Sequence, residues 1–508
     1  MINIKSLLLI AFTLIIISLP LQAEVVRVAE AQGGFEGFYR VNEFCPLKFN
    51  LVTGNNPFKG YLEINTKHIS YLKHFDMPSK SRKELFLAIL IYEPIEEIKF
   101  NIYPEAHRES EYSGRIPLKA VASGQFLIGV EENLYDSFII EFSRYTEASR
   151  HSYFVKIIPE QLPENWQLLE AMDLIVLSDG FVKNGNNKEI LELWQKFSGG
   201  NLLIKNMGQQ FNLKGISRFA PRPHGVFSDK SDMYDAFGKA SWLSRNKESL
   251  YKYLIIYFLF SIAVLLVWFW VRENQKNYLI ISLVLGGLNV LFVGLIFAFC
   301  LIPPDFTSDS LRVTTLNQKE KLVEEEIIST VNPLKAKTIS VNLNNEFARI
   351  VYPDIRVPEF NAGFDFVINE GNRPILKFES RKKHPGFMLE TRQARKTDIF
   401  VSVDKKTIGE TLQYKIVNIA NSDLSDSFLV SSDKAFYIGM IKSGEVRNMS
   451  MEKNTFIAKE ELINKHFPEN RQKRLLEAYL KGKDPGDCLI GWSGKPGNQE
   501  LMIIKIGK

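Results

Sequence analysis

The run LIIYFLFSIAVLLVWFWV occupies residues 254–271, and a second apolar run, YLIISLVLGGLNVLFVGLIFAFCLI, occupies residues 278–302. Only the polar link RENQKN, residues 272–277, separates them. About 20 apolar residues in a helix span the roughly 30 Å hydrocarbon core of a bilayer, whereas a buried helix of a soluble domain is usually shorter. The two runs therefore predict a transmembrane helical hairpin over residues 253–302.

The N-terminus predicts export. Lys5 precedes the apolar stretch Leu7 to Leu19, and Pro20 and Leu21-Gln22-Ala23 follow it. A charged start, a short apolar middle and a small residue at the end are typical of a signal peptide, here residues 1–23, although an uncleaved anchor stays open. Export would place residues 24 to about 250 and the chain after Pro303 outside, and the polar link inside. The expected location is the bacterial cytoplasmic (inner) membrane, with both large segments extracytoplasmic.

Composition limits the possible partners and cross-links. The 508 residues leave room for about three domains besides the hairpin, and a hydrophobic content of 45% can supply their cores. The net charge of +5 comes from scattered lysines without a dense basic block, so nucleic acid is not an expected partner. Cys300 lies in the second apolar run, so at most one disulfide can form, between Cys45 and Cys488. Two buried thiols are the plainer expectation.

The segments on either side of the hairpin differ in the period at which apolar residues recur. Residues 24–153 contain short alternating stretches broken by Gly, Pro and Asn, which predict a β-sandwich of immunoglobulin-like type. Residues 154–248 contain an apolar strand (172–178), a helix (188–197) with Trp194 on its buried face, and a second strand (201–204), so a parallel βαβ crossover is expected. Residues 303–508 alternate again, which predicts a second sandwich followed by a helical stretch at 471–481.

Four groups of passages together resemble a bacterial envelope family of unassigned role. They are Gly34-Phe-Glu-Gly-Phe-Tyr-Arg40 with Phe44-Cys-Pro46 and Gly60-Tyr-Leu62; Trp166 with Met172-Asp-Leu-Ile-Val-Leu177 and residues Trp194 to Gly200; Val417-Asn418 with Asp423-Leu-Ser-Asp-Ser-Phe428, Ile438-Gly439 and Gly444-Glu445; and Leu489-Ile-Gly-Trp492. The chain departs from the family at Phe44, where tryptophan is usual, and at residues 168–170, where a glycine and a tyrosine are commoner.

The resemblance implies an architecture and no reaction. In such proteins a β-sandwich, a domain similar to class I glutamine amidotransferases, a two-helix hairpin and a second sandwich follow one another. The predicted fold class is therefore a multidomain membrane protein with an all-β sandwich, a small α/β domain of flavodoxin or amidotransferase type, a transmembrane hairpin and a second β-sandwich. The expected domains are residues 24–153, 154–248, 253–302 and 303–508.

No catalytic residue is expected. Active amidotransferase relatives use a cysteine nucleophile with a downstream histidine, and no cysteine lies between Cys45 and Cys300. Ser178 ends the first crossover strand, but it lacks the Gly-x-Ser-x-Gly frame, and His224 is the only later histidine before the apolar runs. Three carboxylates, Asp173, Asp179 and Glu164, lie near the ends of that strand, where open α/β sheets bind ligands. Capping and loop solvation are their expected roles.

No metal or cofactor site is expected either. The seven histidines are scattered, and the closest pair, His68 and His74, is expected in a turn region with surface or packing roles. The Asp484-Pro-Gly-Asp487 stretch is too short for a calcium loop. The chain contains neither a phosphate-binding loop of Walker type nor a dinucleotide fingerprint.

The second apolar run carries a candidate contact surface. Asn289 lies between Gly286-Gly287 and the small-residue spacing Gly294-x-x-x-Ala298. A polar amide and small residues four apart allow close helix contact in a membrane. Packing within the hairpin, homo-oligomerisation through the second span and docking to another membrane protein are the alternatives.

The predicted function is that of a non-catalytic, membrane-anchored extracytoplasmic binding or scaffold protein of the bacterial cell envelope. Its expected partners are the membrane and a protein or an envelope polymer. Two alternatives stay open: an envelope hydrolase or transferase with a degenerate amidotransferase-like site, and an accessory subunit of a membrane transport or secretion complex.

Overall fold

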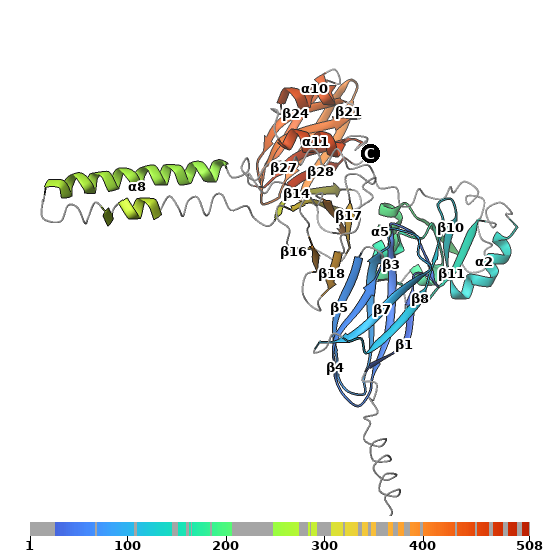
Figure 1. Ribbon diagram of the computed structural model, residues 1–508. Helices are drawn as coiled ribbons and strands as arrows, with labels where there is room; N and C mark the ends of the chain where they lie inside the picture. Colours follow the sequence, from blue (N-terminus) through green and yellow to red (C-terminus); the bar gives the residue numbers. More distant parts are fainter. Residues whose placement is uncertain are drawn as a thin grey trace, which may run out of the picture. The chain divides into compact units, whose positions relative to one another are not determined.

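Figure 1 shows a computed structural model of the chain. It describes residues 26–66, 69–105, 109–144, 151–158, 162–163, 165–182, 185–205, 247–273, 283–284, 286–291, 306–318, 321–333, 338–343, 347–351, 364–368, 374–379, 387–396, 400–431, 434–452, 455–466, 471–480, 486–494 and 500–506. The chain divides into two compact units. Unit 1 is Met1–Phe227, Ser340–Ala348 and Glu359–Phe378, and unit 2 is Ser228–Ile339, Arg349–Pro358 and Glu379–Lys508.

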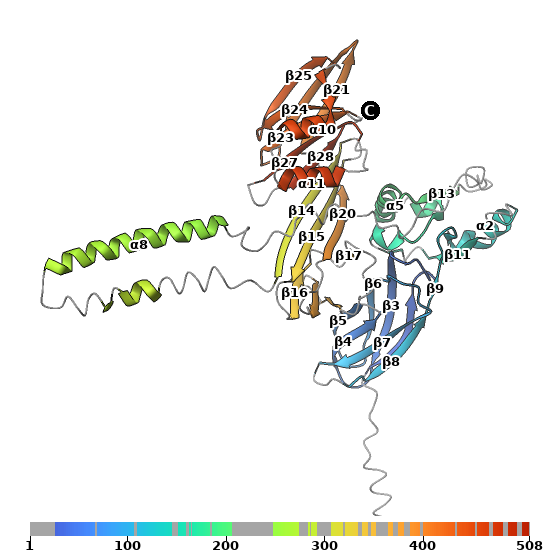
Figure 2. The same ribbon diagram turned by 45° about the horizontal axis from the view of Figure 1, so that its top comes forward.

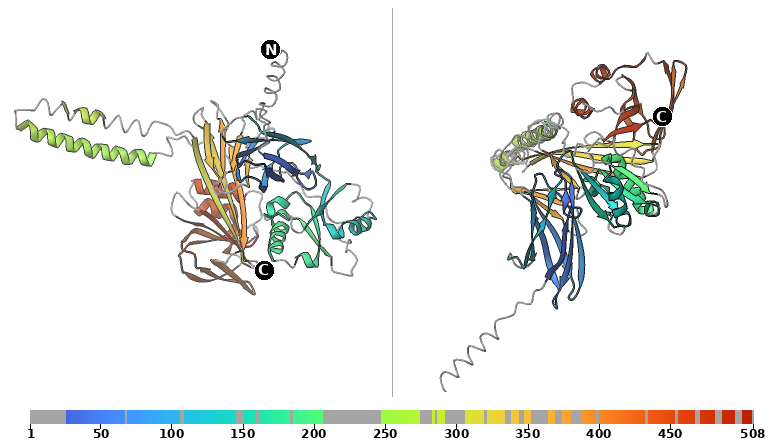
Figure 3. Two further views of the ribbon diagram at one scale, coloured as in Figure 1. Left: turned by 90° about the horizontal axis from the view of Figure 1, so that it is seen from below. Right: turned by 90° about the vertical axis from the view of Figure 1, so that its right-hand side faces the viewer.

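Unit 1 contains two packed β-sheets, whose strands from the N-terminal part of the chain are drawn in blue in Figures 1 and 3. One sheet has the order β1-β3-β6, with β1 at Val26–Gly33, β3 at Phe44–Thr53 and β6 at Arg82–Leu90. The other has the order β16-β19-β18-β5-β4-β7-β8, in which β4 is Phe58–Asn65, β5 is Ile69–Met77, β7 is Glu97–Pro104 and β8 is Tyr112–Pro117. Alternate residues of these strands are buried, and Phe49 of β3 meets Phe100 of β7 edge to face at 5.1 Å. The apolar faces of the two sheets therefore form one core.

Strands from late in the sequence extend the second sheet of unit 1. Strand β18, Phe364–Ile368, pairs in parallel with β5, from Phe364 opposite Ile69 to Ile368 opposite Lys73. Strand β19, Ile375–Glu379, pairs antiparallel with β18, and β16, Thr338–Asn342, lies at the edge. Without β18, the edge of β5 would present unpaired backbone groups, because a sheet edge carries a row of free N–H and C=O groups.

A small parallel sheet also belongs to unit 1 (Figure 1). Its order is β11-β10-β12-β13, with β10 at Phe126–Glu131, β11 at Ser152–Ile157, β12 at Leu174–Ser178 and β13 at Asn201–Lys205. Helix α2, Tyr135–Phe142, packs Phe138 and Phe142 against β10 and β12. Helix α5, Gly185–Ser198, connects β12 to β13, so the predicted crossover is confirmed.

Trp194 anchors this crossover, as predicted. Its side chain is fully buried, and its indole N–H donates a 2.7 Å hydrogen bond to the carbonyl oxygen of Leu169 in the short helix η3, Trp166–Leu169. Gly200 lies directly against the ring, where a Cβ atom would come within 2.1 Å of Trp194 Cζ2. The close approach explains why a glycine follows the helix at this position.

Unit 2 is built around a nine-stranded sheet, clearest in Figure 2. Its order is β17-β20-β15-β14-β28-β27-β23-β24-β26, and the bounds are β14 Phe306–Asn317, β15 Leu322–Pro333, β17 Ala348–Val351, β20 Phe387–Lys396, β23 Leu424–Ser431, β24 Lys434–Ile441, β26 Ile457–Ala458, β27 Cys488–Ser493 and β28 Glu500–Lys505. A second sheet, β21-β22-β25, consists of Val401–Ile408, Thr411–Asn418 and Val446–Glu452. The two sheets share a core that includes Val403, Ile416, Leu429 and Ile504. Helices α10, Lys459–His466, and α11, Arg471–Leu480, also belong to this unit.

The predicted transmembrane hairpin is contradicted. Within the part of the chain that the structure describes, no helix combines the length and the apolar character that a membrane crossing needs. Helix α8, Lys247–Glu273, contains the first apolar run, and much of the second run lies outside the described residues. The predicted fold class is therefore wrong in its membrane part. The transmembrane classification and the predicted membrane contact through two spanning helices are wrong for the same reason.

Both cysteines within the described residues are free thiols. Cys45 lies in β3 and Cys488 begins β27, and each is buried without a disulfide. Burial raises the pKa of the Cys45 thiol to about 12. The plainer expectation, two buried thiols, is therefore the correct one.

Candidate functional site

The parallel sheet of unit 1 has a topological switch point between β10 and β12. The chain leaves β10 toward β11 on one side and returns to β12 on the other side. Ligands of open α/β sheets usually bind at the carboxyl ends of the strands at such a point. Here Glu131 ends β10, Ser178 ends β12, and Lys205, the register partner of Ser178, ends β13.

Glu131 and Ser178 are hydrogen-bonded to each other at this point. The Ser178 backbone N–H donates to Glu131 Oε2 at 2.6 Å, and the Ser178 hydroxyl donates to Oε1 at 3.0 Å. The Glu131 side chain is only 5% exposed. A carboxylate that holds both donors fixes the two strand ends and the first residue of α4, Asp179–Val182.

The Ser178 hydroxyl, hydrogen-bonded to Glu131, is a poor nucleophile. A serine nucleophile normally passes its proton to a histidine or a comparable base, and a carboxylate is a much weaker base than imidazole. His224, the candidate downstream histidine, lies outside the described residues, as does Glu164. The geometry supports hydrogen bonding to a ligand more readily than acyl transfer.

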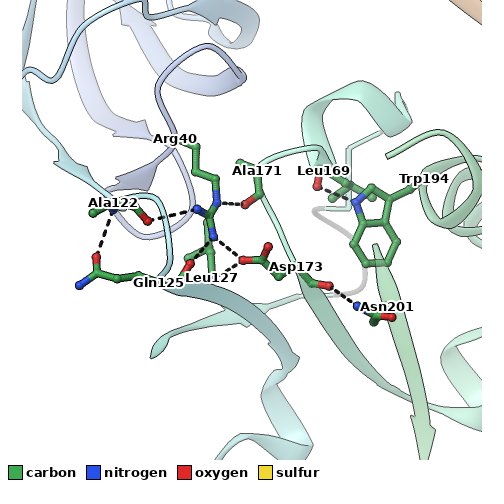
Figure 4. Close-up of polar contacts among 9 residues, drawn as sticks. All are labelled: Arg40, Ala122, Gln125, Leu127, Leu169, Ala171, Asp173, Trp194 and Asn201. Atoms are coloured by element: carbon green, nitrogen blue, oxygen red, sulfur yellow. Dashed lines mark hydrogen bonds and ion pairs between the residues drawn. The ribbon is translucent and has the colours of Figure 1, made fainter. Parts of the chain in front are cut away.

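Asp173 does not lie at the switch point but at the opposite, amino end of β12 (Figure 4). It forms a buried ion pair with Arg40, and its Oδ2 atom also accepts a 2.9 Å hydrogen bond from the backbone N–H of Leu127. Arg40 donates further bonds of 2.7 Å to the carbonyl oxygens of Ala171 and Gln125. Burial lowers the pKa of Arg40, and the Asp173 charge opposes this shift. Arg40 and Asp173 therefore have a structural role, because their ion pair joins the segment after β2 to the start of β12.

The Gly34–Arg40 motif explains how Arg40 reaches this position. Backbone hydrogen bonds join Phe35 and Phe38 in both directions, and Glu36 and Gly37 have φ values of 50° and 87°. Two consecutive positive φ angles are typical of a tight hairpin turn of type I′. The turn leads into β2, Phe38–Tyr39, which pairs with β9, Lys119–Ala120, and Arg40 follows directly. Sequence reasoning quoted this motif but did not find the partner of Arg40.

Of the other residues considered from the sequence, Asp179 lies beside Ser178 in the first turn of α4. His68 lies outside the described residues, and so do Gly294 and Ala298. Asn289 is described, and its Oδ1 atom is buried without a hydrogen-bond partner among the described residues. No group of three or more His, Cys, Asp or Glu side chains that could hold a metal ion occurs among those residues.

A second candidate site lies on the solvent-facing side of the β5-β4-β7-β8 sheet. We define the outer-face strip as His74, Tyr61, Tyr103, Glu63, Asn101 and Ser113. Register places these residues side by side, because Tyr61 is opposite both His74 and Tyr103, and Asn101 is opposite both Glu63 and Ser113. Residues that alternate with them, such as Leu62, Ile64 and Ile102, are buried in the sandwich core. The strip therefore faces away from the core.

The rings of the strip are in contact. The Tyr61 and Tyr103 rings are stacked with centroids 5.2 Å apart and planes 23° apart, and the His74 ring is 5.6 Å from the Tyr61 ring. Burial, followed by the nearby Glu63 carboxylate, raises the pKa of Tyr103. Because the tyrosine rings cover each other, a ligand would meet their edges and hydroxyl groups.

A chain of hydrogen bonds orders the polar part of the strip. Ser110 and Ser113 share a 2.9 Å hydrogen bond, Ser113 donates to Asn101 Oδ1 at 2.8 Å, and the Asn101 amide donates to Glu63 Oε2 at 3.3 Å. Within the described part of the chain, neither the Tyr61 hydroxyl nor the His74 imidazole forms a hydrogen bond, and both residues are partly exposed. Sequence reasoning weighed His74 as a metal ligand, favoured a surface or packing role in a turn region, and missed the strip; the structure places His74 in the strand β5.

Comparison with known proteins gives two matches to family models. A domain of unknown function (DUF8726) matches residues 28–119, which include the outer-face strip, and a domain of unknown function (DUF8725) matches residues 401–503. No curated protein matches the chain. Among solved structures, the chain is similar to a β-D-mannosidase from Dictyoglomus thermophilum, with 8% identity over 86% of this chain and 75% of that one, at a TM-score of 0.17. A TM-score this low carries no argument.

Proposed function

We propose that the chain is an exported, non-catalytic binding or scaffold protein of the bacterial cell envelope. The observation that carries this proposal is the outer-face strip, which gathers ring edges and hydrogen-bonding groups from four adjacent strands on one solvent-facing surface. The Tyr61 hydroxyl and the His74 imidazole form no hydrogen bond with the described residues, so they are available to a ligand. Export is supported by the pattern of residues 1–23, which lie outside the described residues.

The switch point supports the non-catalytic part of the proposal. Glu131 engages both the hydroxyl and the backbone N–H of Ser178, so its carboxylate serves to join two strand ends. The Ser178 hydroxyl directed at a carboxylate is also the one observation in favour of the alternative, an envelope hydrolase or transferase. The two functions differ in whether Ser178 reacts.

A fluorophosphonate probe separates them, because it modifies serines that a base activates. The purified full-length protein would be incubated with the probe and analysed by peptide mass spectrometry. We expect no adduct on Ser178 and none on Ser137, the internal control, whose hydroxyl donates to a backbone carbonyl oxygen. An adduct on Ser178 that disappears in Glu131→Gln would replace the binding function with an enzymatic one.

Photo-crosslinking in intact cells tests the binding function directly. A benzophenone amino acid at Ser113, in the strip, is compared with one at Phe86, which is 41% exposed on β6 in the other sheet of the sandwich. We expect an envelope component to be trapped from position 113 and not from position 86. Equal or absent trapping at both positions would remove the strip as the binding surface.

A further inference from the structure

We propose that the outer-face strip binds a neutral polysaccharide chain of the cell envelope. This inference rests on the proposed binding function and specifies the ligand class of the same surface.

The groups of the strip match a ligand with many hydroxyl groups. Hydroxyl, amide, imidazole and carboxylate groups lie within one surface, and together they offer both donors and acceptors. Each hydroxyl group of a sugar both donates and accepts, so successive sugar residues can satisfy such a mixed surface. A peptide bound in the common extended mode would instead pair with a sheet edge, and the strip lies on a sheet face.

The charge of the surface favours a neutral chain. Glu63 is the only carboxylate in the strip, and it would repel a polyanion while accepting hydrogen bonds from hydroxyl groups. Of the cations on this face, Lys59 lies 3.0 Å from Glu105 and Arg115 lies 3.0 Å from Glu97, whereas Lys99, two residues before Asn101 on β7, is exposed and has no ion pair among the described residues. One unpaired lysine beside one carboxylate gives this surface no net charge that would select an acidic polymer.

The strip is also held in place before a ligand arrives. Tyr61 lies between the rings of His74 and Tyr103, and the Ser113–Asn101–Glu63 hydrogen bonds fix the neighbouring side chains. Side chains that are already ordered lose less conformational entropy on binding. The line from β5 across β4 to β7 covers two strand spacings, about 10 Å, which suits a chain better than a single sugar.

The alternative is that the rings only stabilise the sheet, as cross-strand aromatic pairs do. The variant Tyr61→Phe keeps the ring and removes the hydroxyl, Tyr61→Ala removes both, and Asn101→Ala removes an amide with no ring. Phe86→Ala removes an exposed ring from the other sheet and is the matched control. A purely structural role would lower the melting temperature in Tyr61→Ala without a binding defect in Tyr61→Phe or Asn101→Ala.

The experiment is affinity electrophoresis of the full-length protein in gels that contain laminarin, mannan or hydroxyethyl cellulose, with alginate as the anionic comparison. We expect at least one neutral polysaccharide to retard the wild type and Phe86→Ala equally. The apparent Kd should rise at least tenfold in Tyr61→Ala and Asn101→Ala and about threefold in Tyr61→Phe.

Three results would overturn the inference: no retardation by any neutral polysaccharide, retardation by alginate that is as strong, or unchanged binding in Asn101→Ala and Tyr61→Ala. If position 113 nevertheless crosslinks to a protein in cells, the binding function stands and only the ligand class fails. If position 113 crosslinks to nothing, both fail.

Discussion

Arg40 and Asp173 form a fully buried ion pair between residues that are 133 positions apart in the sequence. Arg40 follows a hairpin turn at the start of the β-sandwich, and Asp173 precedes the strand β12 of the parallel sheet. The pair therefore joins the two parts of unit 1 at a point that excludes water. Removal of two charges from water is costly, so the pair specifies how these parts fit rather than adding much net stability.

We expect Arg40→Met alone to destabilise unit 1 by about 3–5 kcal/mol, because it leaves the Asp173 carboxylate buried without its cation. The double variant Arg40→Met/Asp173→Leu should recover a large part of this loss. Urea unfolding followed by circular dichroism measures both changes. A double variant that is less stable than Arg40→Met would contradict the view that an unpaired charge causes the loss.

The Cys45 thiol should make stability depend on alkaline pH. Its pKa is raised to about 12 in the folded chain, whereas an exposed cysteine ionises near about 8.5. The contribution of this thiol to the free energy of unfolding is therefore fully present below about pH 8.5. It falls as the pH rises and the unfolded chain ionises, by at most about 1.4 kcal/mol per pH unit. The gap in unfolding free energy between wild type and Cys45→Ala should narrow between about pH 9 and 11. A gap that stays constant would show that the thiol ionises equally in both states.

Gly200 should not tolerate a side chain. In Gly200→Ala the new Cβ would lie 2.1 Å from Trp194 Cζ2, and the buried indole has little room to move, so we expect a loss of about 1–3 kcal/mol. Gly180 in α4 is the matched control, because a Cβ there meets nothing within 4 Å. Thermal unfolding of the two variants compares them directly. Equal melting temperatures would mean that Trp194 can shift without cost.

The pairing of β18 with β5 should be accessible to disulfide trapping. Asp365 is the register partner of Ser70, so Ser70→Cys/Asp365→Cys should form a disulfide under mild oxidation. The pair Ser70→Cys/Val367→Cys, two residues out of register, should cross-link much less, because Val367 is opposite Leu72. Mass shifts after alkylation and proteolysis report both. Equal cross-linking of the two pairs would contradict this register.

The sequence predicted best those elements whose signals are local. The crossover of β12, α5 and β13 follows from an apolar strand, a helical face with Trp194 and the glycines that end the helix, all within a short stretch. The hairpin prediction also rested on a local signal, apolar length, but no helix among the described residues is long and apolar enough to cross a membrane.

Features made by distant residues could not be predicted. Asp173 was considered as a loop carboxylate, because nothing near it in the sequence indicates that Arg40 will pair with it. The outer-face strip depends on the register between β5, β4, β7 and β8, and each of these strands alone shows only alternation. Parallel pairing of β18 with β5 has no local signal at all.

The position of β18 in the sequence has a consequence for how the protein is made. The ribosome completes β5 long before it reaches residue 364. The edge of β5 in the nascent chain therefore has no strand to pair with until β18 has been made. An open edge of this kind invites wrong pairing with neighbouring chains, and delivery by a chaperone that keeps the chain unfolded would avoid it. Truncation before residue 364 should therefore yield aggregates rather than a smaller soluble protein.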